Sequence, residues 1–308
     1  MKTWVWLVAF VGLSAPLYAA NEQWFEHNTA LSQAHQHLLE NDMPGMYQAL
    51  IEVWQTAPNT ITQNHLSELL AHSLTWDCGQ SLAAKPLPDW ISALKLTRQT
   101  IESPGRKTYR AIVDITSVED VVDIELTRWP DKELSGEQPI NLIDADGIQT
   151  EQNNSDNVTN FKERQHQKVY SLTSELEAGL YRLAATSHDG NNWSSWVILE
   201  ESQPAMELRW TAQNSWQVQR TQLRNVKCPL PQLVVGLFDY QNGEYQQIWQ
   251  ASYESDYPTT FDPSSAIPDK RYILAVSLNT RRWQGDIVIE HRQTLSRNYE
   301  RSQATTQE

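Results

Sequence analysis

The sequence is poor in positive charge and in the glycine motifs that mark several enzyme classes. It has 24 Lys and Arg residues against 38 Asp and Glu residues, so the 308-residue chain has a formal net charge of −14 at pH 7. An acidic chain repels phosphate backbones and anionic lipids, which makes nucleic acids and membrane surfaces poor partners. The chain also lacks a Gly-rich phosphate-binding loop and a Gly-x-Ser-x-Gly nucleophile elbow. No motif for nucleotide-dependent or serine-hydrolase chemistry is therefore present.

Long apolar runs are absent beyond the N-terminus. Lys2 is followed by an apolar run that ends at Leu17, and Tyr18 and Ala19 come next. The run is shorter than the ~20 residues that a membrane-spanning helix needs, and its flanks are typical of a secretory signal peptide cleaved after Ala19. No cysteine follows that site, so a lipid anchor is not expected there. We expect a soluble protein that is exported to the periplasm and does not insert into a membrane.

Cysteine is scarce, since Cys78 and Cys228 are the two that the chain contains. Exported proteins fold in an oxidising compartment where thiols tend to pair, which favours a disulfide between these two residues. Such a bond would connect the N-terminal region to the C-terminal part of the chain. The alternative is two separately buried thiols.

The mature N-terminal region, residues 20–103, has helical periodicity. Apolar residues recur at helical spacing in three stretches, which are interrupted at Asn41, at Pro58 and after Leu74. A fourth helix is expected at residues 90–95. These stretches predict a small helical bundle.

Two stretches about 90 residues apart have the same pattern and predict the fold of the remaining chain. Each contains an apolar residue, a short turn, a Tyr, an alternating strand, a second turn and a Trp. The tyrosines are Tyr181 and Tyr272, and the tryptophans are Trp193 and Trp283. This pattern is typical of the late strands of an immunoglobulin-like sandwich, where a corner Tyr hydroxyl bonds to backbone just upstream.

The predicted fold is mainly β with an α-helical N-terminal domain, in which a small helical bundle precedes two tandem immunoglobulin-like β-sandwiches. The predicted segments are a signal peptide 1–19, a helical domain 20–103, a first sandwich 104–201, a second sandwich 202–292 and a disordered tail 293–308. The boundaries follow Pro104-Gly105 and the Pro-containing link near residue 203, and the tail has almost no apolar spacing.

Candidate catalytic and metal-binding groups do not add up to a site. Ser92 and Lys95, with the segment 155–157 (Ser-Asp-Asn), resemble two motifs of the penicillin-recognising serine enzymes, but the third motif, Lys-Thr-Gly, is missing. His65, Glu68 and His72 lie on one side of a predicted helix. This arrangement suits metal ligands, and the alternative is a solvated polar face of the helix. The His-Glu-x-x-His signature is absent. We therefore expect no enzymatic activity, no metal and no cofactor.

Tryptophan is unusually frequent, with 13 residues against 5 phenylalanines. Exposed aromatic faces stack on sugar rings, so Trp129, Trp216 and Trp249 are candidates for contact with a glycan of the cell wall. The alternative is that the tryptophans are core residues. Trp193 and Trp283 occupy matching places in the two repeats, which favours a packing role for them.

The layout of the chain resembles an uncharacterised family of exported envelope proteins from vibrio-like gammaproteobacteria, classed as a domain of unknown function. The resemblance covers nearly the whole chain and includes the signal, the opening segment 21–25 (Asn-Glu-Gln-Trp-Phe) and the helical segment that starts at 38–44 (Leu-Leu-Glu-Asn-Asp-Met-Pro) and reaches 52–54 (Glu-Val-Trp). Members look to be encoded beside a two-component system that monitors cell-wall integrity. The resemblance implies an accessory role in the envelope and supplies no catalytic residues.

Together these observations predict a non-enzymatic periplasmic interaction protein, accessory to envelope-stress sensing by a two-component system. Its expected partner is a protein of the periplasm, such as the periplasmic domain of a sensor kinase. The alternative is a protein that binds cell-wall glycan or peptidoglycan through exposed tryptophans. Nucleic acid is not an expected partner.

Overall fold

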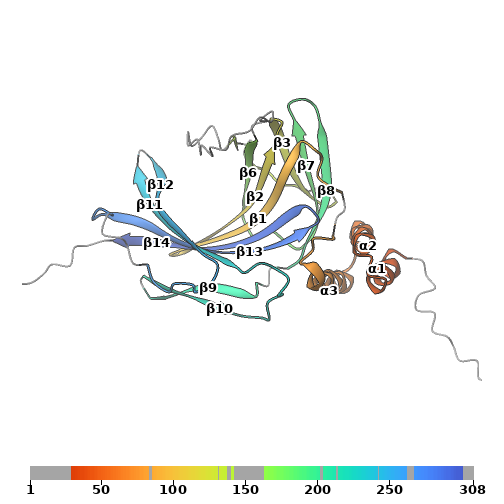
Figure 1. Ribbon diagram of the computed structural model, residues 1–308, viewed down its shortest axis with the longest axis horizontal. Coiled ribbons are helices and arrows are strands. Elements are labelled where there is room, and N and C mark those ends of the chain that lie inside the picture. The colour runs from red at the N-terminus through yellow and green to blue at the C-terminus, as the bar shows by residue number, and fades with distance from the viewer. Residues whose placement is uncertain are drawn as a thin grey trace, which may run out of the picture.

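The structure is a computed structural model of the chain, and Figure 1 shows its arrangement. It describes the following residues: 29–82, 85–130, 132–136, 140–141, 163–201, 204–212, 214–241, 243–261 and 267–300. The predicted signal peptide and the segment 155–157 lie outside these residues.

Three helices form the N-terminal part of the described chain: α1 (Ala30–Leu39), α2 (Met43–Gln55) and α3 (Thr60–Asp77). Thr29 begins α1 with a reciprocal capping box to Ser32, and the side chain of Asn59 accepts a hydrogen bond from the backbone N–H of Thr62 at the start of α3. α3 ends at Cys78, whose left-handed backbone (φ 60°) stops the helix. The predicted helical region is therefore present over these residues.

The fourth predicted helix is wrong, because residues 91–103 form strand β1 (Ile91–Ser103). This strand lies between two neighbours, β2 (Arg106–Ser117) and β14 (Ile287–Glu300), and its pairing with β2 shifts register between Ile91 and Ala93. An irregularity of this kind breaks the period of two, so Ile91 and Leu94 are both buried although they are three positions apart. The apolar residues at 90, 91 and 94 consequently matched a helical spacing.

A curved eight-stranded sheet runs through the molecule in the order β12-β11-β13-β14-β1-β2-β6-β5 (Figure 1). Its remaining members are β5 (Ile140–Asn141), β6 (Arg164–Leu172), β11 (Gln232–Gln241), β12 (Glu244–Tyr253) and β13 (Arg271–Gln284). β1 and β14 pair in parallel, from Leu94 opposite Ile287 to Glu102 opposite Leu295. This pairing joins strands from the two halves of the chain into one sheet.

Two smaller sheets pack on this large sheet. One has the order β4-β3-β7-β8, from β3 (Val121–Arg128), β4 (Lys132–Glu133), β7 (Gly179–Ser187) and β8 (Asn192–Leu199). The other pairs β9 (Met206–Ala212) with β10 (Ser215–Arg220). In β14, Ile287 and Ile289 belong to the core under the four-stranded sheet, whereas Leu295 and Tyr299 belong to the core under β9 and β10. These four positions are separated by even numbers of residues, and the β13–β14 pairing runs through them without a register shift. Their side chains therefore point to one face of the large sheet, and both small sheets lie on that face.

The helices cover the outer face of the four-stranded sheet. Their core of Met46, Leu50, Leu66 and Leu70 continues into β7 and β8 and includes buried residues from both of those strands. The layers in this half are therefore helices, the four-stranded sheet and the large sheet.

The coarse prediction, a mainly β protein with an N-terminal helical region, is confirmed, but the domain plan is not what the chain forms. Two tandem immunoglobulin-like sandwiches would have separate sheets, whereas here the β1–β14 pairing gives both halves one sheet. The boundary at residues 103–104 falls at the β1–β2 hairpin, and the tail predicted from residue 293 is strand β14 as far as Glu300. Local sequence patterns carry no record of this long-range pairing.

Candidate functional site

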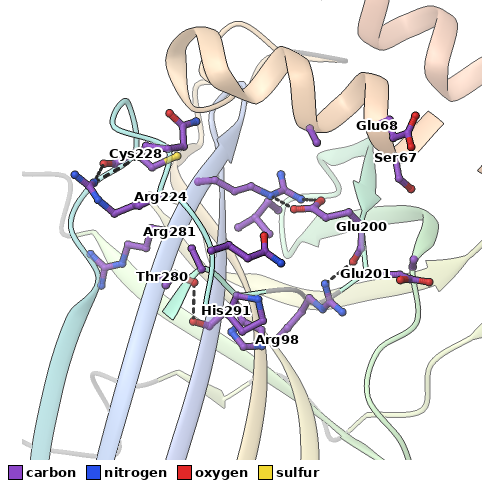
Figure 2. Close-up of a pocket in the computed structure, with 18 of the residues that line it drawn as sticks. Ser67, Glu68, Arg98, Glu200, Glu201, Arg224, Cys228, Thr280, Arg281 and His291 are labelled. Atoms are coloured by element: carbon purple, nitrogen blue, oxygen red, sulfur yellow. Dashed lines mark hydrogen bonds and ion pairs between the residues drawn. The ribbon is translucent and has the colours of Figure 1, made fainter. Parts of the chain in front are cut away.

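A cavity of about 720 Å³ lies where the helices, the large sheet and the two small sheets meet (Figure 2). Its walls are α2 and α3, the centre of the large sheet, the segment that leaves β8, and the loop at residues 221–231, which we call the rim loop. Figure 2 shows Arg98 and His291 across the cavity from Ser67 and Glu68 of α3. A volume of this size falls within the range of small-molecule sites, roughly 300–1,000 Å³.

The rim loop is attached to α3 by a disulfide and a hydrogen bond. Cys78 and Cys228 are bonded, with their Cα atoms 5.1 Å apart, so the predicted bridge is present. Beside it, Asn225 Nδ2 donates to the carbonyl oxygen of Leu74 in the last turn of the helix, at 2.6 Å. Within the loop, Arg224 donates to the carbonyl oxygen of Cys228 at 2.9 Å. These contacts fix a loop without regular secondary structure against the end of the helix.

Arg98 of β1 is a buried cation on the sheet side of the cavity, with 8% of its side chain exposed. Its guanidinium donates to the backbone carbonyls of Glu200 and Leu176, both at 2.8 Å. The nearest carboxylate paired with it, that of Glu175, is 3.7 Å away and its side chain is 42% exposed. Burial lowers the pKa of Arg98 from its usual value, although an arginine remains protonated at neutral pH.

Arg282 of β13 forms an ion pair with Glu200, which follows β8. Arg282 Nε lies 2.8 Å from Glu200 Oε1, and a second guanidinium nitrogen contacts Glu200 Oε2. The Glu200 backbone is also held by Arg98, so one residue links strands β1 and β13 to the end of β8. The inner part of the cavity thus contains two guanidinium groups around one close carboxylate.

His291 of β14 lies beside these groups and is neutral at physiological pH. Burial and, to a smaller extent, the positive charge of Arg98 lower its pKa to about 4, while Glu175 and Glu200 act in the opposite direction. Its backbone carbonyl accepts a long hydrogen bond, 3.4 Å, from the Thr280 hydroxyl of the neighbouring strand.

Exposed apolar side chains form the outer surface of the rim loop. Leu223 is 92% exposed, Val226 is 78% exposed and Leu230 is 51% exposed. Trp76, two residues before the disulfide in α3, is 60% exposed. We call these four residues the rim patch. Scattered exposed apolar residues are ordinary, but several on one short segment mark a contact surface.

The three tryptophans predicted to contact a ligand do not come together. Trp216 is 1% exposed and its ring meets that of Trp210 edge-on, so this candidate is not available to contact a ligand. Trp129 is half-buried and donates its indole N–H to the carbonyl oxygen of Gln55 at 3.1 Å. Trp249 is half-buried against Phe261. Contacts with other protein residues therefore account for the positions of all three tryptophans.

The two corner tyrosines have the geometry that their sequence pattern predicts. Tyr181 is 1% exposed and its hydroxyl donates to the carbonyl oxygen of Glu177 at 2.8 Å. Tyr272 is 2% exposed and donates to the carbonyl oxygen of Pro268, also at 2.8 Å. Trp193 is buried in β8, but Trp283 is half-buried at the end of β13, so the two tryptophans have different surroundings.

The motifs considered for catalysis or metal binding are occupied by other contacts. Ser92 and Lys95 lie on strand β1, where the serine donates to the carbonyl oxygen of Thr116 and the lysine pairs with Asp114. His65 Nε2 lies 2.8 Å from His35 Nε2, between α3 and α1. Over the described part of the chain, no group of three or more His, Cys, Asp or Glu side chains is placed to hold a metal ion.

The cavity residues Arg98, Arg282 and His291 were not anticipated from the sequence. One signal was present: Arg98 interrupts a strand whose neighbours Leu96 and Ile101 are apolar. Charged residues are rarely buried unless they are paired, so such a position attracts attention only when its burial is known.

The chain belongs to a protein family described as "Protein of unknown function (DUF2861)", whose model matches residues 24–300. No curated protein matches the sequence. Among the described residues, no helix has both the length and the apolar character required to cross a membrane.

Proposed function

We propose that this chain is a non-enzymatic interaction protein of the bacterial periplasm and that a protein partner docks on the rim patch. The observation that carries the proposal is the exposure of Leu223, Val226 and Leu230 on a loop held in place by a disulfide. Groups of exposed apolar side chains mark interaction sites on the surfaces of folded proteins.

Attachment of the rim loop supports this role. Holding a loop in one conformation before binding reduces the entropy that association costs. Here the disulfide and the Asn225 bond to Leu74 provide that restraint from the side of α3. The loop therefore presents its apolar side chains as a surface with a defined shape.

The proposed periplasmic location is supported by the predicted signal peptide at residues 1–19 and by the disulfide, since disulfides persist in oxidising compartments. The resemblance to envelope proteins encoded beside a cell-wall-stress system indicates the kind of partner. The proposed partner is the periplasmic domain of a sensor kinase, which the chain assists as an accessory in stress sensing.

Site-specific crosslinking in living cells tests this proposal. A photo-crosslinking residue at Val226 should capture a periplasmic protein, whereas one at the exposed Gln217 of β10 should not. With the crosslinker kept at Val226, the double variant Leu223→Ser, Leu230→Ser should lose the partner and retain its stability, because both side chains are exposed. Ile61→Ser is the matched control, since Ile61 is 82% exposed near the other end of α3. Equal capture by the double variant would contradict the proposal.

The second candidate, a cell-wall glycan binder, has less support because Trp216 is buried and Trp129 and Trp249 pack against protein. It predicts that purified peptidoglycan retains the protein and that Trp129→Ala or Trp249→Ala abolishes this retention. Recovery of peptidoglycan fragments without any protein at Val226 would favour this candidate.

A further inference from the structure

We propose that the central cavity is a binding site for a small organic carboxylate with an apolar body. The cavity shares Leu223 with the rim patch, but its inner groups lie outside the patch, and the proposal does not depend on the docking of a protein partner there. It is based on the hydrogen-bonding groups, charges and shape of the cavity.

Unpartnered hydrogen-bond donors are the first observation. Three buried nitrogen atoms of cavity residues have no hydrogen-bond partner: Trp54 Nε1, Arg98 Nε and Arg282 Nη1. Each can act as a donor and none can accept a hydrogen bond. No side-chain oxygen of a described cavity residue is buried without a partner. Buried polar groups are almost always paired, so this surplus points to a ligand that brings acceptors.

The charges of the inner cavity are the second observation. Arg98 and Arg282 have 8% and 12% of their side chains exposed, and the one close carboxylate between them is that of Glu200. Glu175 is 3.7 Å from Arg98 and is 42% exposed, so solvent screens its effect. A buried cation without full compensation is costly, and an anionic ligand would reduce that cost. The positive character is local, since the whole chain has a net charge of −14.

The chemistry of the donors favours a carboxylate. Arg98 and Arg282 each keep one unpartnered guanidinium nitrogen besides the two that bond to protein acceptors, and the indole N–H of Trp54 adds a single further donor. Hydrogen bonds from a charged guanidinium to a carboxylate oxygen are stronger than those to a neutral acceptor. Apolar residues of the cavity, including Ile289, Leu223 and Pro204, are available for the body of the ligand. The volume of about 720 Å³ limits that body to a few residues of a peptide or one short acyl chain.

Two sources supply this chemistry, the free C-terminus of a short peptide and a fatty acid, and paired probes separate them. The test measures binding of N-acetyl-trialanine and of hexanoate by calorimetry, each beside its carboxamide. The acid of at least one pair should bind about tenfold or more tightly than the amide, because the amide lacks the charge. The acid that binds more tightly identifies the source.

Ala71 allows the charge of the cavity to be changed without removing any contact. It is an exposed residue of α3 that lines the cavity. Ala71→Glu should weaken binding of the acid, and Ala71→Lys should strengthen it, each by roughly threefold to tenfold. Neither change should affect folding, since Glu and Lys are both good helix formers.

Arg98→Gln tests the proposed donor directly and should abolish binding of the acid, with Arg110→Gln, an exposed arginine of β2 outside the cavity, as its control. If circular dichroism shows that Arg98→Gln does not fold, binding of the acid to Ala71→Glu and Ala71→Lys tests the proposal in its place. The proposal is overturned if neither acid binds at millimolar concentration, if acid and amide bind equally, or if both Ala71 variants bind like the parent. The crosslinking at Val226 is read out separately, so either proposal can fail alone.

Discussion

The two hairpins that contain the corner tyrosines begin alike and end in different sheets. β7 and β8 have 9 and 8 residues, and they belong to the four-stranded sheet between the helices and the large sheet. β13 and β14 have 14 residues each and lie in the middle of the large sheet. The tyrosine bond to a carbonyl four residues upstream is the same in both.

The difference shows that a local motif can be repeated without a repeated domain. β14 is long enough to give Ile287 and Ile289 to one core and Leu295 and Tyr299 to the other. β7 and β8 also contribute to two cores, but through opposite faces of the sheet, since Tyr181 and Leu180 point to different sides. The β7–β8 hairpin therefore lies between two layers, whereas the β13–β14 hairpin lies beneath the two small sheets, which are side by side.

The largest expected effect comes from the disulfide, which attaches the second half of the chain to the helices. The double variant Cys78→Ser, Cys228→Ser should lower the free energy of unfolding by about 4–5 kcal/mol, because a loop closed over 150 residues is released in the unfolded state. Urea unfolding measures this loss. Hydrogen exchange should increase more in the rim loop than in β7 and β8, which apolar packing attaches to the helices. A loss smaller than about 1 kcal/mol, or equal exchange in both places, would contradict this account.

Gln284, at the end of β13, connects the two hairpins directly. Its side chain is buried, accepts a hydrogen bond from the backbone N–H of Ile198 in β8 at 3.0 Å, donates to the carbonyl oxygen of Ile198, and contacts the Tyr47 hydroxyl. Gln284→Ala should lower the free energy of unfolding by about 3 kcal/mol, since buried groups of β8 lose their partner. The exposed Gln247→Ala in β12 should change stability by less than about 0.5 kcal/mol. Similar melting temperatures for the two variants would show that the link is unimportant.

His291 in the second hairpin provides a pH dependence on the acidic side of neutrality. Its pKa in the folded protein is about 4, against about 6.5 when unfolded, so the unfolded chain binds more protons between these values. Above pH 6.5 this histidine is neutral in both states and does not reduce the free energy of unfolding. As the pH falls toward 4, the free energy of unfolding decreases by about 2–3 kcal/mol. His291→Gln should reduce the slope of unfolding free energy against pH in that window. An unchanged slope would mean that His291 is accessible to solvent and protonates normally.

The smallest effect tests the feature that the hairpins share. Tyr181→Phe and Tyr272→Phe each remove one hydroxyl bond to backbone and should each lower the free energy of unfolding by about 1 kcal/mol. Thermal unfolding of the two single variants and of the double variant measures these losses. Equal and additive losses would show that the corners act independently despite their different sheets. An unchanged melting temperature for one variant would show that its corner is dispensable.

The candidate site was less predictable than the fold elements around it. The cysteine pair was found because exported thiols tend to be bonded, which is a property of composition and compartment. Arg98, Arg282 and His291 lie on three different strands, and their neighbourhood depends on the pairing of β1 with β14 and of β14 with β13. Trp216 was misjudged for the same reason, because a tryptophan on a short strand is exposed or buried according to which sheet covers it.

The sequence alone determined the features that depend on near neighbours. Helical spacing and capping residues specified α1 to α3, and the short turn before each tyrosine specified the two corners. The tertiary structure decided the features that depend on pairing across the chain. Parallel contact between β1 and β14 turned two expected sandwiches into one shared sheet, made a strand of residues 91–103 and extended β14 to Glu300. Strand pairing joins residues that are almost 200 positions apart here, and no local pattern records which strands will meet.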